Sequence, residues 1–140
     1  MTLTTREKGE VTGPLSQKVL HYGDAIERIV RAAKQPGFTE ETGWAELEAL
    51  IDTDRFERVG NDKAAMGWPV YRKLLTMWAT TTDFRSVFHR ISEVGNLVFL
   101  ELTEHNLPRE GAESVVNSLS LYEFGDDGRL VHLDIYLQHD

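Results

Sequence analysis

Two strand-like segments around a tight turn, near the end of the chain, constrain its fold most. Residues 115–124 and 129–138 are rich in β-branched, leucine and aromatic side chains, and the sequence Gly-Asp-Asp-Gly lies between them at 125–128. Tight hairpin turns favour glycine and aspartate, so the pattern predicts an antiparallel hairpin. Because alternate side chains of a strand point to opposite faces, each strand has one face of apolar residues mixed with hydroxyls. Such a face suits the wall of a ligand pocket.

Composition sets the class of protein. The 140 residues suffice for one domain with a buried core, and 41% hydrophobic with 27% charged residues is typical of soluble globular proteins. A net charge of −8 argues against binding to nucleic acid or to an anionic membrane, which need clustered Lys and Arg. The absence of cysteine excludes disulfides and thiolate metal sites. No signal-peptide core or membrane-spanning apolar run is present, so we expect a cytoplasmic protein.

Three helices are predicted in the first half of the chain, after a polar segment at 1–14 that we expect to be a flexible arm. Apolar residues at three- and four-residue steps predict an amphipathic helix over 15–34, which a Pro-Gly pair ends. Thr42 is the candidate cap of a short helix over 42–51. A proline in the first turn predicts a third helix over 69–80. Its inward residues are expected to be Val70, Leu74, Met77 and Trp78.

The apolar period changes to two after the third helix. Two long strands, 84–94 and 97–106, are predicted to meet at a Gly-Asn pair typical of hairpin turns, and a short strand at 55–59 precedes the third helix. With the closing hairpin, the long strands make a four-stranded antiparallel meander. This order predicts an α+β domain in which three N-terminal helices pack on one face of a curved antiparallel sheet.

The pattern resembles the nuclear transport factor 2-like superfamily, and within it the SnoaL-like and ketosteroid isomerase-like domains. The segments that carry the resemblance are Arg-Phe-Glu-Arg-Val at 55–59, the glycine at 67, Asn-Leu-Val-Phe-Leu-Glu at 96–101, Phe-Gly-Asp-Asp-Gly-Arg-Leu at 124–130 and Asp-Ile-Tyr-Leu at 134–137. The resemblance covers residues 15–138, so we place the domain at 15–140. It implies a cone-shaped (cystatin-like) fold in which helices close a bent sheet over an apolar pocket. Family members include isomerases, polyketide cyclases and binding proteins, so the fold alone does not assign a function.

The resemblance and strand alternation together select residues that face the pocket. The ligand-binding candidates are Tyr22, Phe56, Leu100, Leu102, Asn106, Ser118, Ser120, Leu133, Ile135 and Leu137. The same alternation predicts that Val87, His89 and Ile91 face inward from the first long strand, and Val131 from the last.

The candidate catalytic residues are Arg58, His89, Glu104 and Tyr122. His89 or Glu104 would act as a base, and Arg58 or Tyr122 would stabilise an enolate. An inward carboxylate needs a partner because an unpaired buried charge costs several kcal/mol, so we expect Arg58 and Glu104 to pair. The alternative is that this ion pair only braces the fold.

Known mechanisms of the family do not transfer to this sequence. The resemblance places Arg58 where ketosteroid isomerases have their general base, and a guanidinium does not deprotonate in proteins. It places Ser120 where those enzymes have an oxyanion-stabilising acid. Of three positions that limonene epoxide hydrolases use, here Leu102, Glu104 and Ile135, only Glu104 keeps a chemically active side chain.

Two functions fit the sequence. The first is a pocket protein that binds or converts a small, largely apolar molecule by proton transfer, as an isomerase, cyclase or dehydratase without metal or organic cofactor. The second is a non-catalytic dimeric domain that holds a ligand or a protein partner, which the loss of acids at Arg58 and Ile135 favours. In either case we expect a homodimer through the outer face of the sheet, at Leu119, Leu121 and Tyr136.

Overall fold

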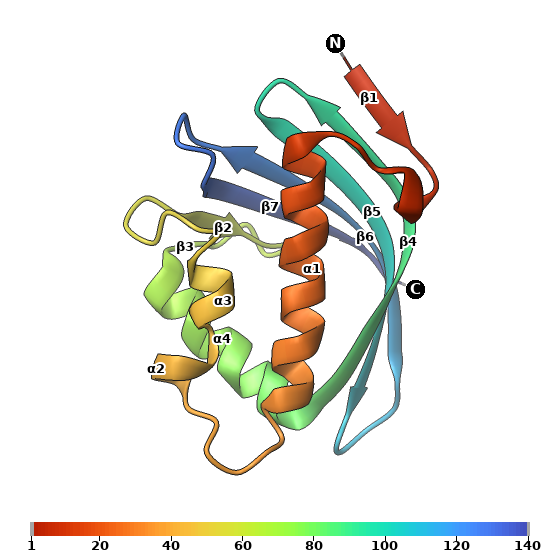
Figure 1. Ribbon diagram of the computed structural model, residues 1–140. Coiled ribbons are helices and arrows are strands. Elements are labelled where there is room, and N and C mark those ends of the chain that lie inside the picture. The colour runs from red at the N-terminus through yellow and green to blue at the C-terminus, as the bar shows by residue number, and fades with distance from the viewer. Residues whose placement is uncertain (1, 140) are drawn as a thin grey trace.

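A seven-stranded sheet bends around the long helix α1 (Pro14–Ala32) in the computed structural model, which describes residues 2–139 (Figure 1). The strands follow the order β1-β4-β5-β6-β7-β2-β3. The four long strands form the predicted antiparallel meander: β4 (Thr82–Val94), β5 (Leu97–Pro108), β6 (Ser114–Phe124) and β7 (Leu130–Gln138). The α+β fold with a curved sheet is therefore confirmed.

Short strands extend both edges of the meander. At one edge β2 (Glu57–Val59) pairs in parallel with β7, and β3 (Ala65–Met66) pairs with β2. At the other edge β1 (Thr2–Thr5) pairs antiparallel with β4. The parallel pair brings β2 beside the closing hairpin, which places Arg58 opposite Leu133.

The start of the chain takes regular secondary structure. After β1, a single 3₁₀ turn (Lys8–Glu10) leads into α1. A carboxylate oxygen of Glu93 accepts hydrogen bonds from the backbone N–H of Ser16, at 2.7 Å, and from its hydroxyl, at 2.8 Å. Glu93 thus caps the first turn of α1 from β4, because helix N-termini leave unpaired N–H groups and favour negative charge. The polar segment therefore contains regular secondary structure that the sequence did not predict, and its flexibility stays a prediction.

The second predicted helix is two short turns, α2 (Glu40–Gly43) and α3 (Ala45–Glu48). Thr39, and not Thr42, caps α2, with its hydroxyl accepting from the backbone N–H of Thr42 at 3.2 Å. Trp44 lies between the turns with no exposed surface, and its indole N–H donates to the Thr76 hydroxyl at 2.8 Å. The predicted helix is interrupted at Trp44, where the large ring is buried.

Helix α4 (Trp68–Thr81) presents a different face to the core from the one predicted. Its buried residues are Trp68, Tyr71, Leu75 and Ala79, whereas Val70, Leu74 and Met77 are exposed. Two apolar stripes run along this helix, and the sequence period does not choose between them. The stripe with the two large aromatic rings takes the core. Trp78, at the border of the stripes, is partly buried as expected.

An irregularity in the β4–β5 pairing changes the face of the sheet to which the side chains in one part of β4 point. The register shifts between Phe88 and Arg90, which leaves His89 outside the ladder. Ile91 is buried as predicted, but Val87 and His89 are exposed on the outer face. One extra residue in a strand moves every side chain before it to the opposite face, so strict alternation fails here.

Candidate ligand chamber

A chamber lies between α1, α4 and the concave face of the sheet. It consists of two cavities that share five lining residues: Tyr71, Leu75, Trp78, Glu104 and Ile135. The tyrosine end, of about 120 Å³, reaches Tyr22 and Tyr122. The arginine end, of about 310 Å³, reaches Arg58 and Asn106. The larger cavity is at the lower limit of typical small-molecule sites, so the chamber suits a small ligand.

Most of the predicted pocket residues lie together on this chamber. The tyrosine end is lined by Tyr22, Leu100, Leu102, Ser120, Tyr122, Leu133 and Ile135, and the arginine end by Arg58, Asn106, Ile135 and Leu137. Phe56 is buried behind the wall and stacks on Tyr71. Ser118 is also buried, and its hydroxyl has no hydrogen-bond partner among residues 2–139. The inner faces of β5 and β6 are therefore as expected, while the role of these residues in binding stays a prediction.

Glu104 is the carboxylate that both ends of the chamber share. Burial raises the pKa of Glu104 because the charged form loses solvation, and the nearby Ser118 hydroxyl opposes this only in part. Within the described chain, no Lys, Arg or His nitrogen lies within 4.0 Å of the Glu104 carboxylate. The expected ion pair with Arg58 is therefore not formed, although both residues line the arginine end.

Three tyrosines surround the inner part of the chamber. The rings of Tyr22 and Tyr122 meet edge to face at 5.6 Å, and Tyr71 lies across from them on α4. The Tyr22 hydroxyl lies close enough to the Tyr71 hydroxyl to influence its pKa, but it makes no hydrogen bond of good geometry. Burial is the main cause that raises the pKa of all three phenols. They stay protonated near neutral pH and can donate hydrogen bonds.

Solved structures share this architecture, although no protein-family model and no curated protein matches the sequence. A candidate SnoaL-like polyketide cyclase from Shewanella denitrificans OS-217 superposes with a TM-score of 0.71 at 12% identity, over 91% of this chain and 92% of that one. A nuclear transport factor 2-like protein of unknown function from Exiguobacterium sp. 255-15 gives 0.69 at 14% identity, over 88% and 99%. The chain has the nuclear transport factor 2-like fold. An LEH-like epoxide hydrolase from M. tuberculosis is also similar, with a TM-score of 0.60 at 18% identity over 85% and 84%.

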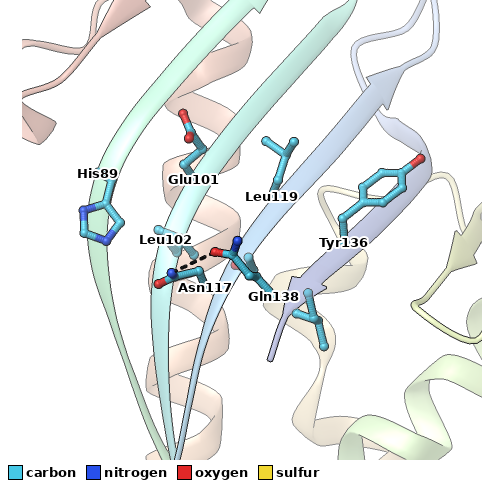
Figure 2. Close-up of a pocket in the computed structure, with 9 residues that line it drawn as sticks. His89, Glu101, Leu102, Asn117, Leu119, Tyr136 and Gln138 are labelled. Atoms are coloured by element: carbon cyan, nitrogen blue, oxygen red, sulfur yellow. Dashed lines mark hydrogen bonds between the residues drawn. The ribbon is translucent and has the colours of Figure 1, made fainter. Parts of the chain in front are cut away.

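The outer face of this nuclear transport factor 2-like sheet carries a second groove, of about 400 Å³ (Figure 2). A row of hydrogen bonds crosses the strands there, from His89 to Thr103 at 2.6 Å, from Thr103 to Asn117 at 2.9 Å, and from Asn117 to Gln138 at 3.1 Å. His89 therefore cannot act in the chamber, and its prediction as an inward base is wrong. The groove is larger than either cavity, but it lies on the opposite face of the sheet from Glu104, Arg58 and the tyrosines.

The sequence missed the α4 wall of the chamber. Tyr71 and Leu75 line both ends, and they are not among the residues predicted to face inward. Together with Trp68 and Ala79 they make one continuous stripe along the helix, but a second apolar stripe has the same period, so the spacing alone does not select it. Trp78 also lines the chamber, and its indole N–H donates to the Asn106 amide oxygen at 3.0 Å.

No group of three His, Cys, Asp or Glu side chains in the part of the chain that the structure describes is placed to hold a metal ion. None of its helices is long and apolar enough to cross a membrane.

The raised pKa of Glu104 predicts how stability changes with pH. The folded protein holds this proton more tightly than the unfolded chain does. Stability is therefore lost as pH rises from the glutamate pKa of the unfolded chain, about 4.3, through the higher pKa of the folded protein. Glu104→Gln removes this loss. Urea unfolding gives the free energy of unfolding of the variant minus that of wild type. We expect this difference to be more positive at about pH 8 than at about pH 4. An equal difference at both pH values would contradict the assignment.

Proposed function

We propose that the chamber binds a small, largely apolar molecule and converts it by proton transfer, with Glu104 as the base. The observation that carries the proposal is a carboxylate with a raised pKa in an apolar chamber, next to phenol donors and without an ion-pair partner among the described residues. A general base works best when its pKa lies near the operating pH, and burial moves that of Glu104 in this direction.

The chemistry follows from the residues at hand. Ionised Glu104 would take a proton from a carbon next to a carbonyl group of the ligand, and the electron pair would move onto the carbonyl oxygen. The phenol hydroxyls of Tyr22 and Tyr122, which burial keeps protonated, would donate to this oxygen. Returning the proton to another atom gives an isomerisation, loss of hydroxide gives a dehydration, and attack on a second carbonyl gives a cyclisation.

A base-dependent elimination tests this proposal without knowledge of the natural substrate. In 5-nitrobenzisoxazole, removal of the C3 proton breaks the N–O bond and releases a coloured cyanophenolate. The compound is bicyclic, flat and largely apolar, so it belongs to the proposed class of small, largely apolar ligands. We expect turnover well above the buffer rate, and inhibition by other flat bicyclic molecules. A rate equal to that of free acetate at the same concentration would contradict the proposal.

A non-catalytic binding domain is the second candidate, because the tyrosine end is only about 120 Å³ and because Arg58 and Ile135 stand where relatives have acids. Binding of bicyclic probes in the chamber without any turnover would favour this function over catalysis.

We also propose a homodimer through the outer face of the sheet. Leu119 and Tyr136 are 40% and 58% exposed there, and Leu121 is partly buried beside them. Exposed apolar side chains on a broad sheet face are typical of interfaces. We expect sedimentation velocity to show a dimer that Tyr136→Glu converts to monomer. Val70→Glu is the matched control, because Val70 is as exposed but lies on α4. A monomeric wild type, or dissociation by Val70→Glu alone, would contradict this interface.

A further inference from the structure

Arg58 is a positively charged residue of the chamber, and it has no ion-pair partner among the described residues. Arg58 lines the arginine end, and within residues 2–139 its guanidinium makes no ion pair within 4.0 Å. Its Nε is buried without a partner. The chain has 23 acidic side chains for 15 Lys and Arg, so partners are plentiful. Arg72, also partly buried, binds both Glu40 and Glu48 at 3.3 Å.

The guanidinium is also held in place. It lies over the Tyr71 ring, 5.2 Å from the ring centre. It also packs on Gly60, where an added Cβ would come within 2.3 Å of Nη1. An arginine that contacts an aromatic ring and a glycine has less conformational freedom to lose when a ligand binds, which favours tight binding of an anion.

The nearby carboxylate does not serve as the missing partner. Glu104 lines the same end but forms no ion pair with Arg58, and burial favours its neutral form. From Arg58 the chamber continues past Glu104 to the apolar side chains and tyrosines of the other end. A molecule with its anionic group at Arg58 would therefore lay its apolar body along Glu104.

We infer that the ligand is a small, largely apolar carboxylic acid whose carboxylate binds Arg58. This inference rests on the proposed function, since it names the class of molecule that the same chamber takes. Guanidinium and carboxylate groups match in charge and geometry, and such hydrogen bonds are stronger than neutral ones. Gly60 is a positioning residue in this account.

The test compares two probes of the same shape, 2-naphthoate and its uncharged analogue 2-naphthamide, by isothermal titration calorimetry. We expect naphthoate to bind wild type about 10- to 100-fold more tightly than the amide, as for hydrogen bonds to charged groups. Arg58→Gln should remove this preference, because glutamine carries no charge that attracts the carboxylate. Gly60→Ala should weaken naphthoate selectively. Its φ is not in the left-handed region, so the added methyl displaces the guanidinium without backbone strain.

The outcomes separate the two proposals. Equal binding of the acid and the amide by wild type would overturn this inference and leave the chamber as a ligand site. Retention of the preference in both Arg58→Gln and Gly60→Ala would also overturn it, because the carboxylate would then be recognised elsewhere. Binding of neither probe would overturn both the inference and the proposed function. Circular dichroism spectra that match wild type identify variants that have folded.

Discussion

Trp44→Ala is expected to lower the free energy of unfolding by about 3–5 kcal/mol, the usual cost of removing a fully buried tryptophan. Trp44 has no exposed surface, donates to Thr76 on α4, and meets Phe38 edge to face at 6.2 Å. The variant loses this packing and leaves a void between α3 and α4. Because a domain of this size is stable by about 5–15 kcal/mol, urea denaturation should show a large fall in midpoint.

Trp44→Phe is the matched control. It keeps an aromatic ring but loses the bond to Thr76, whose hydroxyl still donates to the Arg72 carbonyl at 2.8 Å. We expect this variant to lose only about 1–2 kcal/mol. A loss below about 1 kcal/mol for Trp44→Ala would show that the ring does not anchor α4, which forms one wall of the chamber.

Glu104→Gln is expected to lower kcat/KM for the benzisoxazole elimination by about 100- to 10,000-fold, the range for loss of a general base. The wild-type rate should rise with pH around a pKa above the ordinary value for glutamate, because burial raises the pKa of Glu104. The titratable groups that face it are Arg58, Tyr22, Tyr71 and Tyr122. None of them changes charge between about pH 5 and 8, since the phenol pKa values are raised by burial and guanidinium stays charged.

The variant His89→Gln distinguishes between the two predicted bases, His89 and Glu104. His89 is an imidazole that could serve as a base, but it lies on the outer face, bonded to Thr103. We expect the rate and its pH dependence to stay unchanged in this variant and to become flat in Glu104→Gln. The opposite pattern would move the reaction to the outer groove.

Strand alternation and the family resemblance together were sufficient to predict the inner faces of the long strands β5 and β6. The closing hairpin is an example: Ser118, Ser120 and Tyr122 are buried on β6, as alternation predicts, and the Gly-Asp-Asp-Gly turn joins it to β7. The meander and the inner faces of β5 and β6 follow from such patterns, because a slip of one residue would expose the whole apolar set.

Two features that shape the site depend on three-dimensional packing and were not predictable from periodicity. The register shift at Phe88–Arg90 turns His89 outward, and no residue type at this position marks a bulge. The rotation of α4 follows from which of two apolar stripes packs best, and it brings Tyr71 into the chamber. The absence of an Arg58–Glu104 pair has the same origin, since Tyr71 and Gly60 hold the guanidinium.

The position of the ligand can be measured directly from the three tryptophan indole N–H signals in a ¹⁵N–¹H correlation spectrum. The Trp78 indole lines the chamber and donates to Asn106, whereas the Trp44 indole is enclosed against Thr76. On titration with 2-naphthoate, we predict a large shift of the Trp78 signal, assigned with Trp78→Phe, and little change at Trp44. Shifts confined to backbone amides of the outer groove, such as those of Asn117 and Leu119, with Trp78 unmoved, would contradict the chamber as the ligand site.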